Sequence, residues 1–126
     1  MTTALWCVLI AGLMPLLWTG FAKVTAPRFN NRDPRTWQAN LEGRAKRAHA
    51  AHLNSFEAFP LFLAGVWVAH QAGVATTTLD SLAIAYIILR LGYGICYLQD
   101  WHAARSLVWF AALGCNIALF FLAASV

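Results

Sequence analysis

Two arginines in the second half of the chain have neighbours that suit an anion-binding site. Arg90, Tyr93 and Tyr97 recur at steps of three and four, so a helix would place them on one face. Arg105 precedes Ser106 near the start of a later apolar segment. A helix N-terminus favours anions, and a guanidinium beside a hydroxyl would there stabilise a thiolate or a carboxylate. An arginine that only anchors the helix at a membrane surface is the alternative.

A second polar series occupies one helical face earlier in the chain. Its members change from cationic through amide to carboxylate: Arg44, Arg47, Ala51, Asn54, Glu57 and Pro60. Such a face is unsuited to lipid, so we expect it to point into a bundle or toward a neighbouring subunit. Arg90 needs a partner inside an apolar segment, and we pair it with Glu57, the only carboxylate at comparable depth. This pair would fix helix packing, and a ligand role for Glu57 is compatible with it.

The histidines and cysteines do not form the pattern of a metal site. His49 and His52 are three residues apart, but no set of carboxylates or cysteines accompanies them. The cysteines, Cys7, Cys96 and Cys115, lie in apolar segments and are expected to be free thiols. We therefore predict no metal, and the sequence has no nucleophile elbow, phosphate loop or zinc signature.

The composition indicates an integral membrane protein. Of the 126 residues, 60% are hydrophobic and 11% are charged, whereas soluble domains have about 25% charged residues. Four helices of about 20 residues would nearly use up the length, so we expect one all-α domain, residues 1–126, with four transmembrane helices. The net charge is +4, but no basic, aromatic-interleaved soluble surface exists, so nucleic acid is not an expected partner.

Caps and helix breakers set the expected limits of the helices. Asp33 followed by Pro34 is typical of a cap and a first helical residue. Thr78 or Asp80 is expected to begin the third helix, and Asp100 to cap the fourth. The expected helices span about residues 2–22, 34–71, 78–98 and 101–125.

The placement of basic residues predicts the topology. Most of them lie between the first two helices or at the base of the second: Lys23, Arg28, Arg32, Arg35, Arg44, Lys46 and Arg47. Arg105 adjoins the loop between the third and fourth helices, and the loop between the second and third has no cation. The first and third loops should therefore face the cytoplasm, with both termini outward. Lys23 is either a stop-transfer cation or a cation of the site.

Three stretches resemble the MAPEG family, the membrane-associated proteins in eicosanoid and glutathione metabolism. They are TGFAK at residues 19–23, RAKRAHAAHLNSFEAFP at 44–60 and RLGYGICYLQDWHAARSLVW at 90–109. The resemblance covers nearly the whole chain and is to bacterial-type members. It implies a four-helix subunit in a bacterial inner membrane that assembles as a homotrimer.

The resemblance also implies that glutathione binds between adjacent subunits near the cytoplasmic face. By position, Arg105 would stabilise the glutathione thiolate as a catalytic residue, with Ser106 beside it. The other expected glutathione-binding residues are Lys23, Arg47, Asn54, Glu57, Arg90, Tyr93, Tyr97 and Trp109. The chain departs from the eicosanoid enzymes at Ala50 and Leu53, where these have arginines. Trp109 likewise stands where several members have tyrosine.

Two functions fit these residues. The first is a glutathione-dependent membrane transferase or peroxidase, which takes lipophilic electrophiles or lipid hydroperoxides from the bilayer as its second substrate. The second is a non-catalytic membrane protein of the same fold that uses the polar face for subunit packing. Ala50 and Leu53 favour the second function, whereas Tyr97, Arg105 and Ser106 favour the first. The second substrate stays open, as does whether Arg44 or Arg47 reaches the ligand.

Overall fold

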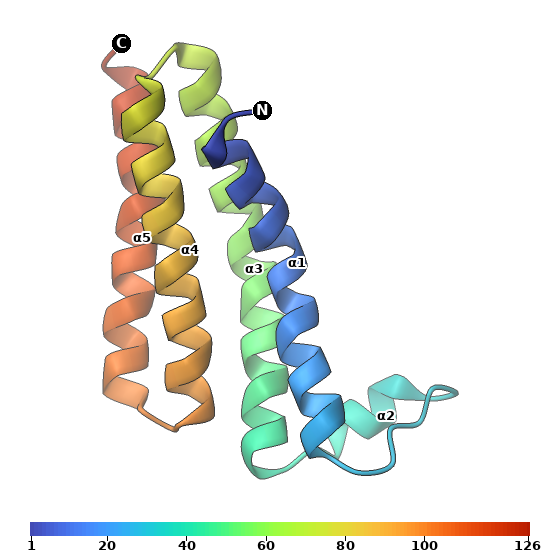
Figure 1. The fold of residues 1–126 in the computed structure, drawn as a ribbon. Helices are drawn as coiled ribbons and strands as arrows, with labels where there is room; N and C mark the ends of the chain where they lie inside the picture. Colours follow the sequence, from blue (N-terminus) through green and yellow to red (C-terminus); the bar gives the residue numbers. More distant parts are fainter.

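The computed structural model describes residues 1–126 as an all-α protein (Figure 1). Four long helices run side by side, and a short helix lies apart at one end of the bundle. Both termini lie at the opposite end from this short helix. The helices are α1 (Thr3–Thr25), α2 (Pro34–Ala39), α3 (Gly43–Ala72), α4 (Thr76–Leu98) and α5 (His102–Ala124). We call the end with α2 and the α4–α5 turn the basal end.

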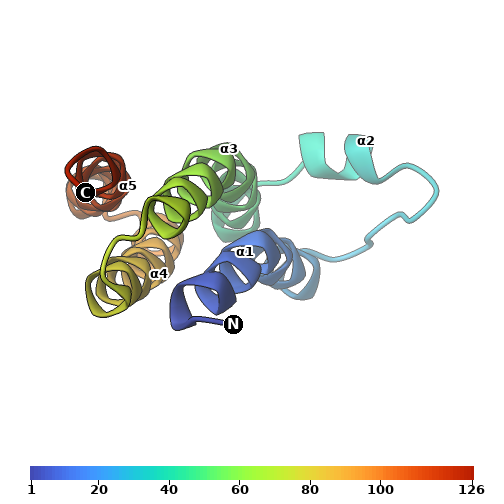
Figure 2. The ribbon, with the colours of Figure 1, turned by 90° about the horizontal axis from the view of Figure 1, so that it is seen from above.

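Three of the long helices, α1, α4 and α5, are long and apolar enough to cross a membrane. The fourth, α3, has 30 residues and would measure about 45 Å as a straight helix, which exceeds the roughly 30 Å of a hydrocarbon core. Its cationic first turns can therefore lie outside the core while the rest crosses it. Figure 2 shows α3 between α1 and the α4–α5 pair, so α3 has helices on both sides.

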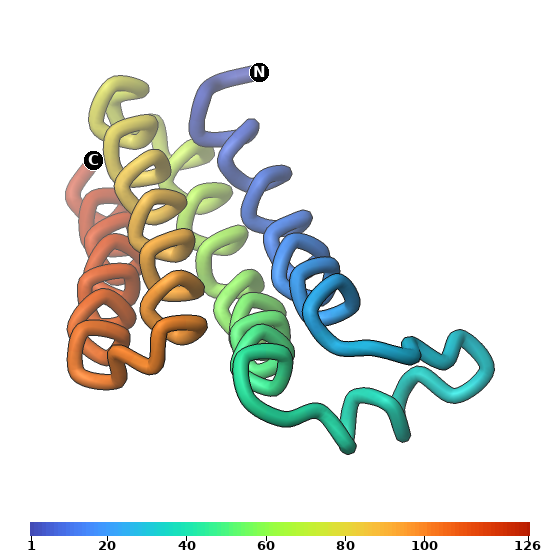
Figure 3. Tube along the Cα trace, turned by 60° about the horizontal axis from the view of Figure 1, so that its bottom comes forward, coloured from blue at the N-terminus to red at the C-terminus, as the bar shows by residue number.

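The predicted second helix, 34–71, is not continuous. It breaks at residues 40–42 into α2 and α3, and the segment before α3 swings away from the bundle (Figure 3). The Asn40 side chain donates to the Thr36 carbonyl at 3.0 Å, and Gly43 has a φ of 57°. An amide that satisfies the last turn of α2, together with a glycine at positive φ, redirects the chain.

The predicted start of this region is confirmed. Asp33 is the N-cap of α2, and its carboxylate accepts from the Thr36 amide at 3.3 Å, with Pro34 as the first helical residue. Hydrogen bonds from the side chain and backbone of Thr36 lower the pKa of Asp33. The cap is therefore present above the ordinary range of an aspartate pKa and is lost only as the pH falls through the lowered value.

The starts of the last two helices differ from the prediction. Helix α4 begins at Thr76, and Asp80 instead accepts from the Ala4 amide of α1 at 2.7 Å. Asp100 does not cap α5, because it has a φ of 60° in the turn and Trp101 is the N-cap residue. No side chain caps α5. Its first amides are therefore free to bind an anion at the basal end.

Small residues let α1 lie close to its neighbours. The Trp18 ring of α1, which is 5% exposed, lies directly on Gly94 of α4. Buried alanines line the contact between α1 and α3, among them Ala11, Ala22, Ala48 and Ala51. Close approach through small residues is the usual way for membrane helices to gain packing energy.

Because a Cβ atom at Gly94 would overlap the Trp18 ring, we expect Gly94→Ala to destabilise the protein by about 1–3 kcal/mol. Thermal unfolding in detergent measures this change. Gly114→Ala on α5 is the matched control, since a Cβ there meets nothing within 4 Å. Equal stability of the two variants would show that α1 does not pack on α4 in this way.

Candidate functional site

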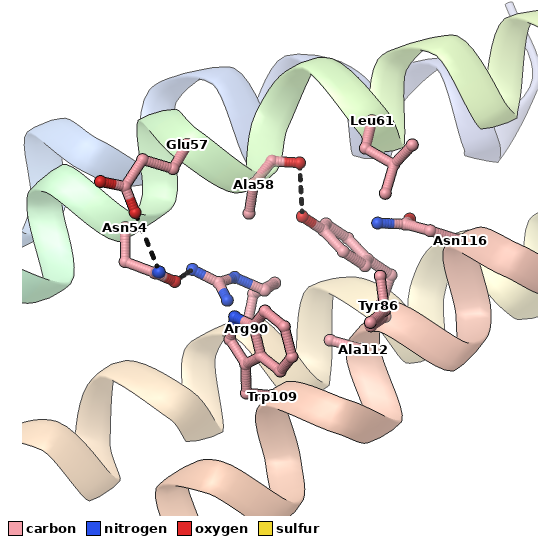
Figure 4. Close-up of a pocket in the computed structure, with 10 residues that line it drawn as sticks. Asn54, Glu57, Ala58, Leu61, Tyr86, Arg90, Trp109, Ala112 and Asn116 are labelled. Atoms are coloured by element: carbon pink, nitrogen blue, oxygen red, sulfur yellow. Dashed lines mark hydrogen bonds between the residues drawn. The ribbon is translucent and has the colours of Figure 1, made fainter.

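A cavity of about 190 Å³ lies between α3, α4 and α5 (Figure 4). Asn54, Glu57 and Arg90 form its polar basal end. Trp109 lies beside Arg90, and mostly apolar side chains line the cavity further in. The cavity thus begins among the predicted polar residues and continues into the apolar part of the bundle.

Arg90 is the most deeply buried charged side chain of the site, at 3% exposed. Its Nη2 donates to Asn54 Oδ1 at 2.7 Å, and Asn54 Nδ2 donates to Glu57 Oε2 at 3.2 Å. The predicted direct pair of Arg90 and Glu57 is therefore wrong. Asn54 stands between them because its short side chain reaches the guanidinium, while Glu57 lies on the exposed side of α3.

Arg90 also begins a series of ring contacts that leads to α5. Its guanidinium lies 4.4 Å from the centroid of the Tyr93 ring. Tyr93 packs edge-on against Tyr97, with ring centroids 5.7 Å apart. The Arg105 guanidinium in turn lies 4.2 Å from the centroid of the Tyr97 ring. We call Arg90, Tyr93, Tyr97 and Arg105 the arginine–tyrosine ladder.

Arg105 ends the ladder in the first turn of α5, where no side chain caps the helix. The ring of Tyr97 covers one face of its guanidinium, so the N–H groups in the guanidinium plane stay free to donate. Ser106 follows and is exposed, and Trp109, one turn further along, lines the cavity. A guanidinium beside free helix amides is well suited to bind an anion.

Two predicted site cations lie outside the cavity of a single subunit. Arg47 donates through Nε and Nη2 to the Leu98 carbonyl, both at 3.3 Å, and so satisfies the C-terminus of α4. Lys23 is exposed, with its ammonium 4.1 Å from the centroid of the Phe29 ring. The structure therefore brings together the predicted residues of α3, α4 and α5, and leaves the cations of α1 and the base of α3 apart.

The sequence did not lead us to the two other polar residues of the cavity, Tyr86 and Asn116. Asn116 is the only amide or charged residue in the run from Leu107 to Val126. An unaccompanied amide in such a run is costly in a membrane and could have marked the position. Tyr86 lies one turn before Arg90 on the same face of α4, which was a weaker signal.

The cavity is smaller than the roughly 300–1,000 Å³ of most small-molecule sites. A ligand the size of a tripeptide would therefore need walls that one subunit lacks. No group of three His, Cys, Asp or Glu side chains is close enough together to hold a metal ion. The arrangement supplies guanidinium groups, an amide and tyrosine rings, which suit an organic anion.

We expect Asn54→Leu to lower the free energy of unfolding by about 2 kcal/mol, since it removes the hydrogen-bond partner of a buried cation. Glu57→Gln is the matched control, because glutamine can still accept from Asn54, and it should cost less than about 0.5 kcal/mol. Denaturation in mixed micelles measures both. If Glu57→Gln costs more than Asn54→Leu, the carboxylate and not the amide supports Arg90.

Residues 3–125 match the MAPEG family, whose fold is a four-helix membrane bundle. The family includes glutathione-dependent membrane transferases and peroxidases. No curated protein gives a significant match to the chain. Because the family match spans nearly the whole chain and the structure has the expected long apolar helices, this protein is a multi-pass integral membrane protein that belongs to the MAPEG family.

Proposed function

We propose that the protein is a glutathione-dependent transferase or peroxidase that acts on lipophilic electrophiles or lipid hydroperoxides. The observation that carries the proposal is Arg105 held against Tyr97 at the uncapped start of α5. Glutathione has two carboxylates, one ammonium group and a thiol. Arginines bind carboxylates through paired hydrogen bonds, and Glu57 and Asn54 can receive ammonium and amide groups.

Arg105 would act on the glutathione thiol. A free thiol has a pKa of about 8.5, so little of it is ionised at neutral pH. A guanidinium and the N-terminus of a helix both favour the thiolate, which is the nucleophile. The Ser106 hydroxyl beside it would donate a second hydrogen bond to the sulfur.

The thiolate would then attack a substrate that arrives from the bilayer. In a substitution, attack on an electrophilic carbon forms a carbon–sulfur bond as the bond to the leaving group breaks. In an addition to an activated double bond, the carbon–sulfur bond forms as the π bond breaks, and the resulting carbanion of the adduct takes up a proton. Attack on a lipid hydroperoxide breaks its O–O bond and gives the lipid alcohol and a glutathione sulfenic acid, which a second glutathione reduces with release of water. Trp109, in the cavity wall, would contact the lipophilic part of either substrate.

A homotrimer of single-domain subunits, residues 1–126, would complete the site. The cavity of one subunit is too small for glutathione, and Lys23 and Arg47 lie outside it. Binding between subunits would let these cations reach a ligand that also contacts the ladder. The basal end, with most of the cations, would face the cytoplasm and the termini would face outward, in the inner membrane of a bacterium.

A non-catalytic role in subunit packing is the second candidate. In its favour, Arg90 donates to Asn54 and Asn54 donates to Glu57 without any ligand between them. Ala50 and Leu53 also leave α3 with fewer cations for a tripeptide carboxylate. The two candidates differ in whether the purified protein binds glutathione.

We expect the parent protein to bind glutathione in calorimetric titrations, and Arg105→Ala to weaken binding at least about tenfold, the effect of one charged hydrogen-bond partner. Arg105→Lys should retain part of the affinity because it keeps the charge but loses the planar donor pattern. Arg32→Ala, in the exposed loop before α2, is the control and should bind as the parent does. A parent protein that binds no glutathione up to millimolar concentration would remove the enzyme proposal.

Native mass spectrometry should find three subunits with glutathione bound only to the trimer. Detergent conditions that dissociate the trimer should abolish binding, since one subunit lacks part of the walls. A monomer that binds glutathione as tightly as the trimer would place the whole site within one subunit.

A further inference from the structure

The inner end of the cavity holds two polar side chains that the proposed reaction does not use. Asn116 of α5 and Tyr86 of α4 lie there, with Leu61 and Ala112 beside them (Figure 4). Asn116 is 3% exposed, and its carboxamide oxygen is buried with no hydrogen-bond partner. A buried amide oxygen without a partner is costly in apolar surroundings, so a hydroxyl donor bound in the cavity would stabilise this position.

Tyr86 is held in place but its hydroxyl is poorly satisfied. The ring is 2% exposed and stacks on Phe62, with centroids 3.9 Å apart. The hydroxyl donates only to the Ala58 carbonyl, over 3.5 Å. That distance is at the limit of a hydrogen bond. The Tyr86 hydroxyl could therefore donate its hydrogen bond to a closer acceptor in the cavity without any movement of the ring.

The two groups together match a hydroxyl group. The ligand oxygen can accept from the Tyr86 hydroxyl while its proton is donated to the Asn116 carboxamide oxygen. Rotation of the carboxamide about its terminal bond turns that oxygen toward the cavity. A single water occupies about 30 Å³, so it would leave most of a largely apolar cavity empty, whereas a cavity of about 150 Å³ can hold a benzene ring.

We propose that Tyr86 and Asn116 form a hydroxyl-binding subsite for a lipophilic ligand that fills the inner cavity. Its occupant is a molecule with an apolar body and an alcohol group. The subsite itself is independent of glutathione. Its use as part of an active site rests on the proposed function.

The spacing along α5 says which part of a substrate would bind here. Asn116 is seven residues beyond Trp109 and eleven beyond Arg105, or about 10 Å and 16 Å along a helix. A group at Asn116 is too far from Arg105 to be the reacting centre. The subsite would therefore select elongated lipophilic substrates that carry a hydroxyl about 16 Å from the electrophilic atom.

Two probes that differ only in the hydroxyl test the subsite: 4-fluorobenzyl alcohol and 4-fluorotoluene. Fluorine NMR of the trimer in detergent, without glutathione, measures their binding against partition into empty micelles. The parent protein should bind the alcohol at least about tenfold more tightly than the toluene, the effect of one to two satisfied hydrogen bonds. Equal binding of the two probes, or no binding of the alcohol, would overturn the proposal and leave the Asn116 oxygen to a water molecule.

Variants assign the preference to these residues. Asn116→Leu and Tyr86→Phe should each reduce the preference for the alcohol to about twofold or less. Neither should lower thermal stability much, because the Asn116 oxygen has no partner and the Tyr86 hydroxyl has only one long hydrogen bond. Gln71→Leu, the same kind of change at an exposed position of α3, should leave the preference unchanged. A preference that survives in Tyr86→Phe and Asn116→Leu would place the alcohol elsewhere and overturn the assignment. If Asn116→Leu does not fold, Tyr86→Phe decides.

Glutathione calorimetry on the same preparations separates this proposal from the proposed function. If the protein prefers the alcohol but binds no glutathione, the hydroxyl-binding subsite is supported and the proposed enzymatic function is wrong. If it binds glutathione without preferring the alcohol, the proposed function is supported and the subsite proposal is wrong.

Discussion

The buried charge of Arg90 is the constraint on which the site depends. An arginine at the centre of a membrane helix costs about 2.5–3.5 kcal/mol on insertion scales, and this cost must be offset by fixed partners. Asn54 on α3 supplies a hydrogen bond of 2.7 Å, and Tyr93 supplies a ring face. The hydrogen bond to Asn54 joins α3 to α4, whereas the contact with Tyr93 lies within α4. A shift of either helix that separates Arg90 from Asn54 would leave the cation without its partner on α3, so this one charge favours a particular register of the two helices.

The position of Arg90 also affects α5, through the packing of the Tyr93 and Tyr97 rings. Tyr93 orients Tyr97, and Tyr97 covers one face of the Arg105 guanidinium. Arg105 is thereby fixed at a helix start whose amides no side chain caps. The N–H groups of its guanidinium and those amides are donors that would suit an anion. The two arginines of the arginine–tyrosine ladder therefore differ in their contacts. Arg90 joins α4 to α3 through Asn54, whereas the guanidinium N–H groups of Arg105 remain free to bind a ligand.

The sequence predicted the parts of this arrangement that depend on local pattern. Apolar runs gave the long helices, and the spacing of Arg90, Tyr93 and Tyr97 gave their common face. It did not predict contacts that depend on how helices approach each other. Arg90 donates a hydrogen bond to Asn54 and not to Glu57, because the partner is decided by which side chain reaches the guanidinium. Asp80 accepts a hydrogen bond from the Ala4 amide because the first turns of α1 and α4 lie close together. Asn116 could have been noticed as a polar residue in an apolar run, but its partner Tyr86 became apparent only with the cavity.

We propose that the arginine–tyrosine ladder holds Arg105 so that it stabilises a glutathione thiolate. Ultraviolet difference spectra of the parent trimer with bound glutathione, recorded across pH, would test this role of Arg105. We expect the pKa of the bound thiol to lie below the value of about 8.5 for a free thiol, and Arg105→Ala to return it to that range. A bound thiol that ionises as it does in solution, or one whose ionisation is the same in Arg105→Ala, would show that Arg105 does not stabilise the thiolate.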